Sequence, residues 1–395
     1  MKKAIFFLLV TLVSGVQNLV SQEIPAAEVY LITCGPGTAT YSIYGHSALR
    51  IVIPETNSDL VYNWGVFDFD TPNFAWRFAK GRLDYSLGVY PYKRFLEDYF
   101  FEQRWVVSQR MNLEQDEIEQ LFALITENLK PENIKYRYDF FYDDCSTRIR
   151  DILEKSIGDK LLYPPDEPKK SLPTFRDKVG EYQRAYPWMN FGVDLIMGSP
   201  GDKKASVRDM MFLPIDLKNG LSAAVVNRNS RMIPLLRDPE IVLPAGNQVK
   251  KEKFFTSPFF IFTLLIIVVL ILTAIYRGKT FNKTIDIILF TLFSVLALLM
   301  IFFNFFTDHQ QMRWNLNIIW LNPAILFCLA SLVSNKHWQM WFRITFFLAA
   351  GFLAFVIILP QEINDAFVPL IITLAIRSSV RSGFSWNPLS QPHLT

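Results

Sequence analysis

The hydrophobic pattern divides the chain near Lys253. Before that point charged, aromatic and apolar residues are mixed as in a globular domain, whereas long uncharged runs dominate beyond it. A membrane-spanning helix needs roughly 20 apolar residues, and four runs come close to that length: 254–276, 287–307, 314–335 and 344–361. A fifth run, 366–376, is short for a span and predicts either a helix extended to Val380 or a re-entrant piece.

The first 21 residues have the pattern of a secretory signal peptide. Two lysines precede an apolar run at residues 4–16, and small or polar residues follow up to a predicted cleavage near Ser21. An uncleaved anchor is the alternative. In both cases the segment that starts near Glu23 is exported.

Charge around the apolar runs predicts the same orientation. Cytoplasmic loops are enriched in Lys and Arg, and one side of the runs carries seven such residues while the other carries only Arg313. We therefore expect a bacterial inner-membrane protein whose N-terminal domain lies in the periplasm. The seven residues are Arg277, Lys279, Lys283, Lys336, Arg343, Arg377 and Arg381.

Patterns within the exported region predict an α+β domain. Segments rich in β-branched and aromatic residues predict strands, and apolar residues at helical spacing predict a helix over 114–129. A second helix is expected to start at Cys145, with Asp143 or Asp144 as its N-cap. The mixed order of the elements is typical of α+β folds. The expected strands cover 28–33, 41–53, 60–69 and 83–90, and 136–142 is expected to be extended.

Composition fits this organisation. Hydrophobic residues make up 51% of the chain and the mean hydropathy is +0.19, which is high for a soluble protein. The net charge is only +3 without Lys/Arg blocks, so nothing indicates a nucleic-acid partner. We expect an α+β periplasmic domain followed by an all-α transmembrane bundle. The expected parts are a signal peptide (1–21), a catalytic core (22–163), an elaboration and linker (164–252), four or five membrane helices (253–380) and a cytoplasmic tail (381–395).

Cys145 and His46 are a candidate nucleophile and base. A thiol at a helix start meets free backbone N–H groups and the helix dipole, which favour the thiolate and can stabilise an oxyanion. His46 is the only histidine before the membrane region, and a nucleophilic thiol needs a base. From spacing alone three interpretations stay open: a catalytic pair, a Cys34–Cys145 disulfide in the oxidising periplasm, or inert residues. Cys328 lies inside the third run, where we expect a structural role.

Five short motifs stand out along the chain: TCGPG at 33–37, YGHSALR at 44–50, NWGVFDF at 63–69, DCSTRIRD at 144–151, and His309 with WNLNIIWLNP at 314–323. Together they resemble motifs of the Lnb-type lipoprotein N-acyltransferases. One departure is Asp144, where that family more often has Asn. The order of His before Cys also resembles permuted papain-like enzymes of the NlpC/P60 and lecithin:retinol acyltransferase type, in which the His lies on a strand and the Cys opens a helix.

The resemblance implies N-acylation of the amino-terminal S-diacylglyceryl cysteine of lipoproteins through a Cys145 thioester. The acyl donor would be a membrane phospholipid or a lipoprotein ester, the acceptor a diacylated lipoprotein, and no metal or cofactor is needed. Asp68 is a candidate to orient His46, with Asp70 as its alternative. Candidate substrate-binding residues are Tyr44, Arg148, His309, Arg313 and Asn315.

A further expectation concerns the third apolar run. We expect Asn315 and Asn322, seven residues apart, to share a face of a membrane helix, with His309 and Asn315 below the thiol.

The alternative enzyme is an NlpC/P60-like cysteine amidase or endopeptidase that acts on cell-wall peptides. A third class is a non-enzymatic assembly or sensor protein that contains the disulfide.

Overall fold

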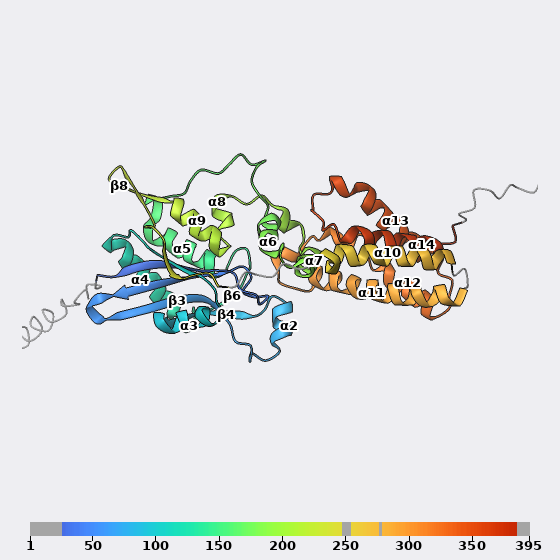
Figure 1. Ribbon diagram of the computed structural model, residues 1–395, viewed down its shortest axis with the longest axis horizontal. Helices are drawn as coiled ribbons and strands as arrows, with labels where there is room; N and C mark the ends of the chain where they lie inside the picture. Colours follow the sequence, from blue (N-terminus) through green and yellow to red (C-terminus); the bar gives the residue numbers. More distant parts are fainter. Residues whose placement is uncertain (1–25, 247–253, 276–278, 385–395) are drawn as a thin grey trace, which may run out of the picture.

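The computed structural model describes residues 26–246, 254–275 and 279–384. A sheet-containing domain and a helical bundle lie one after the other along the long axis of the molecule (Figure 1). The predicted signal peptide and most of the predicted tail lie outside the described residues.

A seven-stranded antiparallel sheet is the centre of the N-terminal domain. Register along β1 and β2 is continuous from Glu28 opposite Val52 to Cys34 opposite His46. The second strand starts at His46 and not at residue 41 as predicted, because the preceding residues form a turn in which the Gly45 N–H donates to the Ser42 carbonyl. In spatial order the strands are β10 (Glu240–Leu243), β5 (Val106–Arg110), β1 (Glu28–Cys34), β2 (His46–Ile53), β3 (Ser58–Val66), β4 (Asp84–Pro91) and β6 (Lys135–Arg137).

Helices cover both faces of this sheet, so its strands are apolar on both sides. In β1, Val29 and Leu31 pack on one face against α4 (Gln115–Leu129), α5 (Cys145–Ile157) and α9 (Pro214–Ala223). Ile32 and Cys34 face the other side and pack against α3 (Tyr92–Phe101). The predicted helix over 114–129 is confirmed as α4. The remaining elements are α2 (Phe74–Ala79), α6 (Phe175–Gln183), α7 (Pro187–Ile196), α8 (Val207–Met210) and a small sheet of β7 (Leu161–Leu162), β8 (Val225–Arg228) and β9 (Arg231–Pro234).

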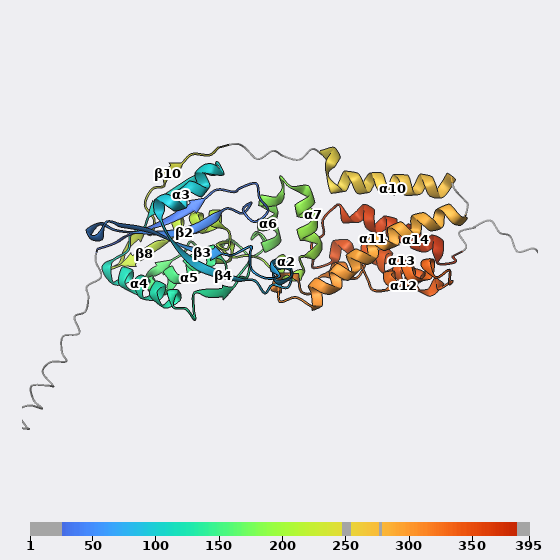
Figure 2. The ribbon, with the colours of Figure 1, turned by 90° about the horizontal axis from the view of Figure 1, so that it is seen from below.

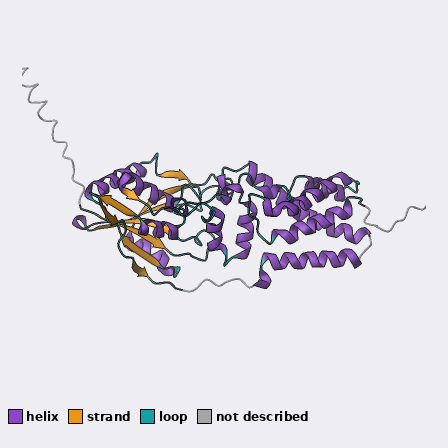
Figure 3. Cartoon of the chain, turned by 90° about the horizontal axis from the view of Figure 1, so that it is seen from above, coloured by secondary structure: helices purple, strands orange, loops and turns teal. Residues whose placement is uncertain are grey.

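The C-terminal half is a helical bundle (Figure 3). Three described helices are long and apolar enough to cross a membrane, at Pro258–Ile275, Asn282–Phe305 and Gln339–Ile358. The predicted fifth run forms a helix that continues to Arg381. The bundle helices are α10 (Pro258–Ile275), α11 (Lys279–Phe305), α12 (Ala324–Val333), α13 (Gln339–Phe355) and α14 (Phe367–Arg381).

The prediction of one continuous helix over 314–335 is wrong. Only its C-terminal part is helical, as the short α12, and the residues before it form 3-10 turns. The asparagines explain the difference, because their side chains bond to nearby backbone N–H groups. The Asn315 Oδ1 accepts from the Asn317 N–H (2.9 Å) and caps a 3-10 turn, and the Asn322 Oδ1 accepts from the Ala324 N–H (3.1 Å) at the start of α12. Asn315 and Asn322 therefore do not share a helix face.

This irregular segment joins the bundle to the N-terminal domain. The Asn315 and Asn317 side-chain amides both donate to the Leu195 carbonyl at the end of α7, at 2.8 and 3.2 Å. The Gly198 N–H donates to the Gln311 carbonyl at 2.8 Å. Helices α6 and α7 thus lie between the sheet and the bundle (Figure 2).

Candidate functional site

Cys145 is the first residue of α5, as the sequence predicts. The preceding Asp144 is the N-cap: its Oδ1 accepts the N–H groups of Ser146 (2.9 Å) and Thr147 (2.8 Å). In return the Thr147 hydroxyl accepts the Asp144 N–H at 2.7 Å, which completes a capping box. The cap fixes the helix start, and with it the position of the sulfur.

His46 opens β2, and its partner lies on the neighbouring strand β3. The His46 Nε2–H donates to the Asn63 Oδ1 at 2.6 Å. Because a carbonyl oxygen only accepts hydrogen bonds, Nε2 carries the proton of the neutral ring and the lone pair is left on Nδ1. The arrangement resembles the Cys-His-Asn variant of the catalytic triad.

Asn63, and not Asp68, is the residue hydrogen-bonded to the His46 imidazole in the structure. Strand β3 ends at Val66, so Asp68 lies beyond it in an exposed loop, where its Oδ1 accepts the Asp70 N–H at 2.9 Å. Sequence reasoning missed the role of Asn63, although the residue opens the quoted NWGVFDF motif.

Three groups converge on Gly65. A Cβ atom at this position would lie 3.6 Å from the Cys145 Cβ, 3.9 Å from the His46 Cε1 and 4.0 Å from the Tyr136 Oη. Gly65 has a φ of +92°, which side chains rarely adopt. Glycine thus keeps free the space that the thiol and the imidazole share.

Burial makes His46 a neutral base. It lowers the pKa of the imidazole to about 4, against the hydrogen bond to Asn63, which raises it, while the positive charge of Arg104 lowers it further. At neutral pH the ring is therefore unprotonated and can accept a proton.

The thiol of Cys145 is also neutral, contrary to the expectation of a lowered pKa. Burial raises the pKa of Cys145 and outweighs the backbone N–H groups of Ser47, Ser146 and Cys145 itself, which lower it. These N–H groups would still be available to stabilise negative charge that develops beside the sulfur. Both Cys145 and His46 remain partly accessible.

The carboxyl of Asp144 does not act as a simple negative charge beside the thiol. Burial, followed by the proximity of Cys145, raises its pKa well above the ordinary value, although hydrogen bonds from Thr147 and Ser146 lower it. A carboxyl group whose ionised form is disfavoured resembles the Asn amide expected at this position. Asp144 therefore opposes thiolate formation at Cys145 less than a charged carboxylate would.

Tyr136 is a further polar group at the site that sequence reasoning missed. Its hydroxyl is buried and has no hydrogen-bond partner among the described residues. The ring is held by Arg148, whose guanidinium lies 3.8 Å from the ring centroid and forms a bidentate ion pair with Asp143. Arg148, a predicted substrate-binding residue, thus fixes Tyr136 and the loop before Cys145.

Cys34 faces His46 across the β1–β2 ladder but is chemically unlike Cys145. It is fully buried, and burial raises the pKa of its thiol to about 12. All three cysteines are free, so the disulfide interpretation does not describe this structure.

The other predicted substrate-binding residues lie in packed or junction positions. The Tyr44 hydroxyl accepts a hydrogen bond from the Gln183 Nε2 at 2.6 Å. The His309 Nε2 lies 3.0 Å from the Phe78 carbonyl, and Arg313 is exposed. Asn315 is buried and bonded to α7 as described above.

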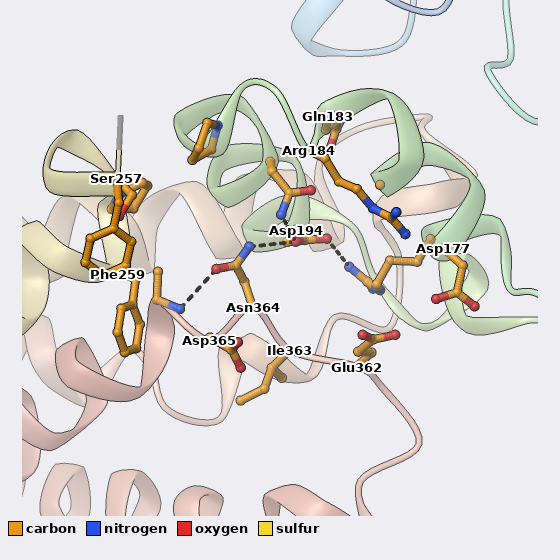
Figure 4. Close-up of a pocket in the computed structure, with 17 residues that line it drawn as sticks. Asp177, Gln183, Arg184, Asp194, Ser257, Phe259, Glu362, Ile363, Asn364 and Asp365 are labelled. Atoms are coloured by element: carbon orange, nitrogen blue, oxygen red, sulfur yellow. Dashed lines mark hydrogen bonds and ion pairs between the residues drawn. The ribbon is translucent and has the colours of Figure 1, made fainter. Parts of the chain in front are cut away.

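A cleft of about 560 Å³ lies at the junction of the two halves (Figure 4). Its wall contains Asp194, which pairs with Arg176 at 3.1 Å and accepts from the Asn364 amide at 2.8 Å. Neither Cys145 nor His46 lines it. Among the described residues, no cluster of three or more His, Cys, Asp or Glu could hold a metal ion.

Two family models match the chain. The model of the Lnb N-terminal periplasmic domain matches residues 17–174, which include Cys145, His46, Asn63 and Tyr136. The model of the Lnb transmembrane domain matches residues 250–385, which include the helical bundle. No curated protein and no solved structure matches the chain.

Proposed function

Because the chain belongs to the Lnb-type family, whose acyltransferase domain lies in the periplasm and is anchored in the inner membrane, we propose that it N-acylates lipoproteins through a thioester on Cys145. In this proposal residues 22–163 form the catalytic core and 164–252 elaborate it. The acceptor is the amino-terminal S-diacylglyceryl cysteine of a diacylated lipoprotein, and the donor is a fatty ester in the same membrane.

The first half-reaction forms the thioester. The Cys145 sulfur attacks the ester carbonyl while its proton passes to the His46 Nδ1. The C–O bond of the ester then breaks, and the imidazolium returns the proton to the leaving alcohol. The N–H groups of Ser47 and Ser146, with the unpartnered hydroxyl of Tyr136, stabilise the oxyanion of the tetrahedral intermediate.

The second half-reaction transfers the chain. The lipoprotein amino group attacks the thioester carbonyl, a C–N bond forms, and the C–S bond breaks. His46 takes the proton from the amine and returns it to the sulfur. Asn63 holds the imidazole in one tautomer through both steps.

The observation that carries this proposal is the convergence of the Cys145 and His46 side chains on Gly65, with Asn63 hydrogen-bonded to the imidazole. The test uses the full chain in phospholipid vesicles with a synthetic diacylated lipopeptide. Mass spectrometry should find the lipopeptide with one added amide-linked chain, and intact-protein mass should find an acyl adduct on Cys145.

Cys145→Ala should abolish both products, and Cys34→Ala is the matched control. Cys34 is a second free thiol of the domain, but it is fully buried, it does not stand at a helix start, and burial raises its pKa to about 12. Wild-type transfer by Cys145→Ala would rule out the thioester mechanism. Cleavage of an added cell-wall peptide, with no chain transferred to the lipopeptide, would instead support the amidase or endopeptidase alternative.

A further inference from the structure

Four large aromatic side chains are exposed on one part of the periplasmic domain. They belong to α2 and to the loops beside it, and we call them the α2 aromatic surface. Exposed apolar clusters of this kind mark interaction sites. The exposed fractions are 61% for Tyr41, 63% for Phe69, 55% for Trp76 and 53% for Phe78.

The α2 aromatic surface adjoins a membrane helix. The Trp76 ring packs against the Phe302 ring with centroids 5.5 Å apart. Phe302 lies in the last turn of the apolar span Asn282–Phe305. With the predicted orientation, this end of α11 is at the outer face of the membrane. Lys80 adds a cation 4.9 Å from the Trp76 ring, and the pairing of Trp with Lys is typical of membrane interfaces.

Helix α2 is held firmly in this position. Arg82 pairs with Asp308 at 2.7 Å, and the Asp308 N–H donates to the Lys80 carbonyl at 2.9 Å. His309 lies against Gly81, where a Cβ would meet the imidazole at 3.2 Å, and its Nε2 contacts the Phe78 carbonyl. Helix α2 is therefore anchored beside the periplasmic end of the bundle (Figure 2).

A series of aromatic contacts leads from α2 to the thiol. The last ring of the series, Tyr136, places its Oη 4.0 Å from the Cβ position of Gly65, which in turn lies 3.6 Å from the Cys145 Cβ. Aromatic rings in contact thus connect the membrane edge with the surroundings of Cys145. Successive ring centroids lie 6.3, 5.9, 5.2 and 6.5 Å apart along Phe78, Phe74, Phe67, Tyr85 and Tyr136.

We propose that phospholipid acyl chains of the outer leaflet cover the α2 aromatic surface, and that lipid-borne esters reach Cys145 along this edge. The continuity of the surface with the apolar span through Trp76 and Phe302 identifies the occupant as the bilayer. The inference that substrates enter here rests on the proposed function, whereas the contact with the bilayer does not.

The contact is tested with a phospholipid that carries a diazirine in its acyl chain. The wild-type chain is reconstituted in vesicles of this lipid, irradiated and digested, and the adducts are located by mass spectrometry. We expect adducts on the peptides that carry Phe69, Trp76 and Phe78, in addition to the membrane helices. Adducts confined to the membrane helices would overturn the proposal.

The entry route is tested by the double variant Trp76→Ser/Phe78→Ser. Loss of two half-exposed aromatic contacts with lipid should slow acylation of Cys145 in lipopeptide-containing vesicles by about tenfold. The matched control is Phe100→Ser/Phe101→Ser, whose side chains are 65% and 78% exposed. They belong to α3, a helix that lies away from the bundle (Figure 1). The control should acylate at the wild-type rate.

Alkylation of Cys145 by iodoacetamide reports whether the double variant is folded, and it should proceed as in the wild type. A folded double variant that is acylated at the wild-type rate would overturn the route. If the wild type itself never gains an acyl group on Cys145, the proposed function fails, while the diazirine result still decides whether the α2 aromatic surface contacts the bilayer.

Discussion

At the scale of single residues, the neutral state of His46 makes a pH prediction. The base is lost when the ring is protonated, so the rate of Cys145 acylation should fall on the acid side with a midpoint near the imidazole pKa of about 4. A free imidazole would give a midpoint at about pH 6.5. Acylation by an ester donor, followed by intact-protein mass from pH 3 to 8, checks this, and a midpoint at the free-imidazole value would contradict it.

The same shift affects stability. The folded-state pKa of His46 lies below that of the unfolded chain, so its contribution is fully present above about pH 6.5 and is lost as the pH falls toward 4. Acid exposure within this window should therefore lower the unfolding temperature before it removes the base.

Asn63 should matter more than Asp68. Asn63→Ala removes the hydrogen bond that fixes the His46 tautomer and should lower kcat about tenfold to a hundredfold, because a triad residue acts through imidazole orientation. KM should change little. Asp68→Ala is the control, since that carboxylate only accepts a loop N–H. Equal kcat losses in both variants would indicate a general structural effect and exclude a specific orienting role for Asn63.

Tyr136→Phe separates the hydroxyl from the ring. The phenyl ring keeps the contact with Arg148, while the unpartnered hydroxyl beside Gly65 is removed. If this hydroxyl stabilises the oxyanion, kcat should fall about a hundredfold with little change in KM. Steady-state kinetics with the lipopeptide distinguish this from a packing role, for which Phe would retain nearly full activity.

The sequence could identify Cys145 and His46 because each has a local signal. One follows a capping residue at a helix start, and the other is the only imidazole of the exported domain. Asn63 and Tyr136 have no such signal. Their positions depend on the pairing of β2 with β3 and of β4 with β6, which are contacts between strands that periodicity along the chain does not contain.

At the scale of elements, predictions succeeded where one pattern dominates and failed where side chains compete with the backbone. Helix α4 has a continuous apolar stripe and a capping box, so its ends were predicted within one residue. The 314–323 segment carries no charge and belongs to a long apolar run, but Asn315 and Asn322 bond to nearby N–H groups and favour turns.

The same segment predicts a structural role for Asn315. Its side chain donates to the Leu195 carbonyl and accepts from the Gln361 amide at 3.1 Å, so Asn315→Ala leaves buried groups unpaired. We expect a loss of about 1–3 kcal/mol in stability. Membrane abundance and thermal midpoint should fall, while Cys145 alkylation per molecule should not. Gln310→Ala, an exposed neighbour, should change neither. Loss of acyl transfer by Asn315→Ala at unchanged membrane abundance would instead support a role of Asn315 in substrate binding.

At the scale of the whole molecule, hydrogen bonds and an ion pair join the periplasmic domain to the helical bundle. The irregular 308–323 segment makes these contacts at the periplasmic end of the helices. Asn315 donates to the Leu195 carbonyl of α7, and Asp308 binds Arg82 and the Lys80 carbonyl just after α2. The sequence predicted this division into two halves, because the change in hydropathy near residue 253 is a property of composition. The sequence could not predict how the periplasmic domain packs on the bundle, because these contacts depend on single side chains.

The last prediction concerns an ion pair that holds the bundle together. Asp286 on α11 is fully buried and binds two arginines of α14, Arg377 at 2.6 Å and Arg381 at 2.5 Å. Arg377 also donates to the Thr273 hydroxyl on α10, so the network joins three helices. Asp286→Ala leaves Arg377 buried without its counter-charge and should cost about 3–5 kcal/mol.

The protein should then fall in membrane abundance and in thermal midpoint in detergent. The compensating variant Asp286→Leu/Arg377→Met removes both buried charges and should recover most of the loss, because apolar side chains of similar volume can replace a buried ion pair. Arg381 is 27% exposed and can reach water without Asp286. Recovery would show that the single variant fails through an uncompensated charge. Wild-type abundance of Asp286→Ala would mean that helix packing alone holds α14 in the bundle.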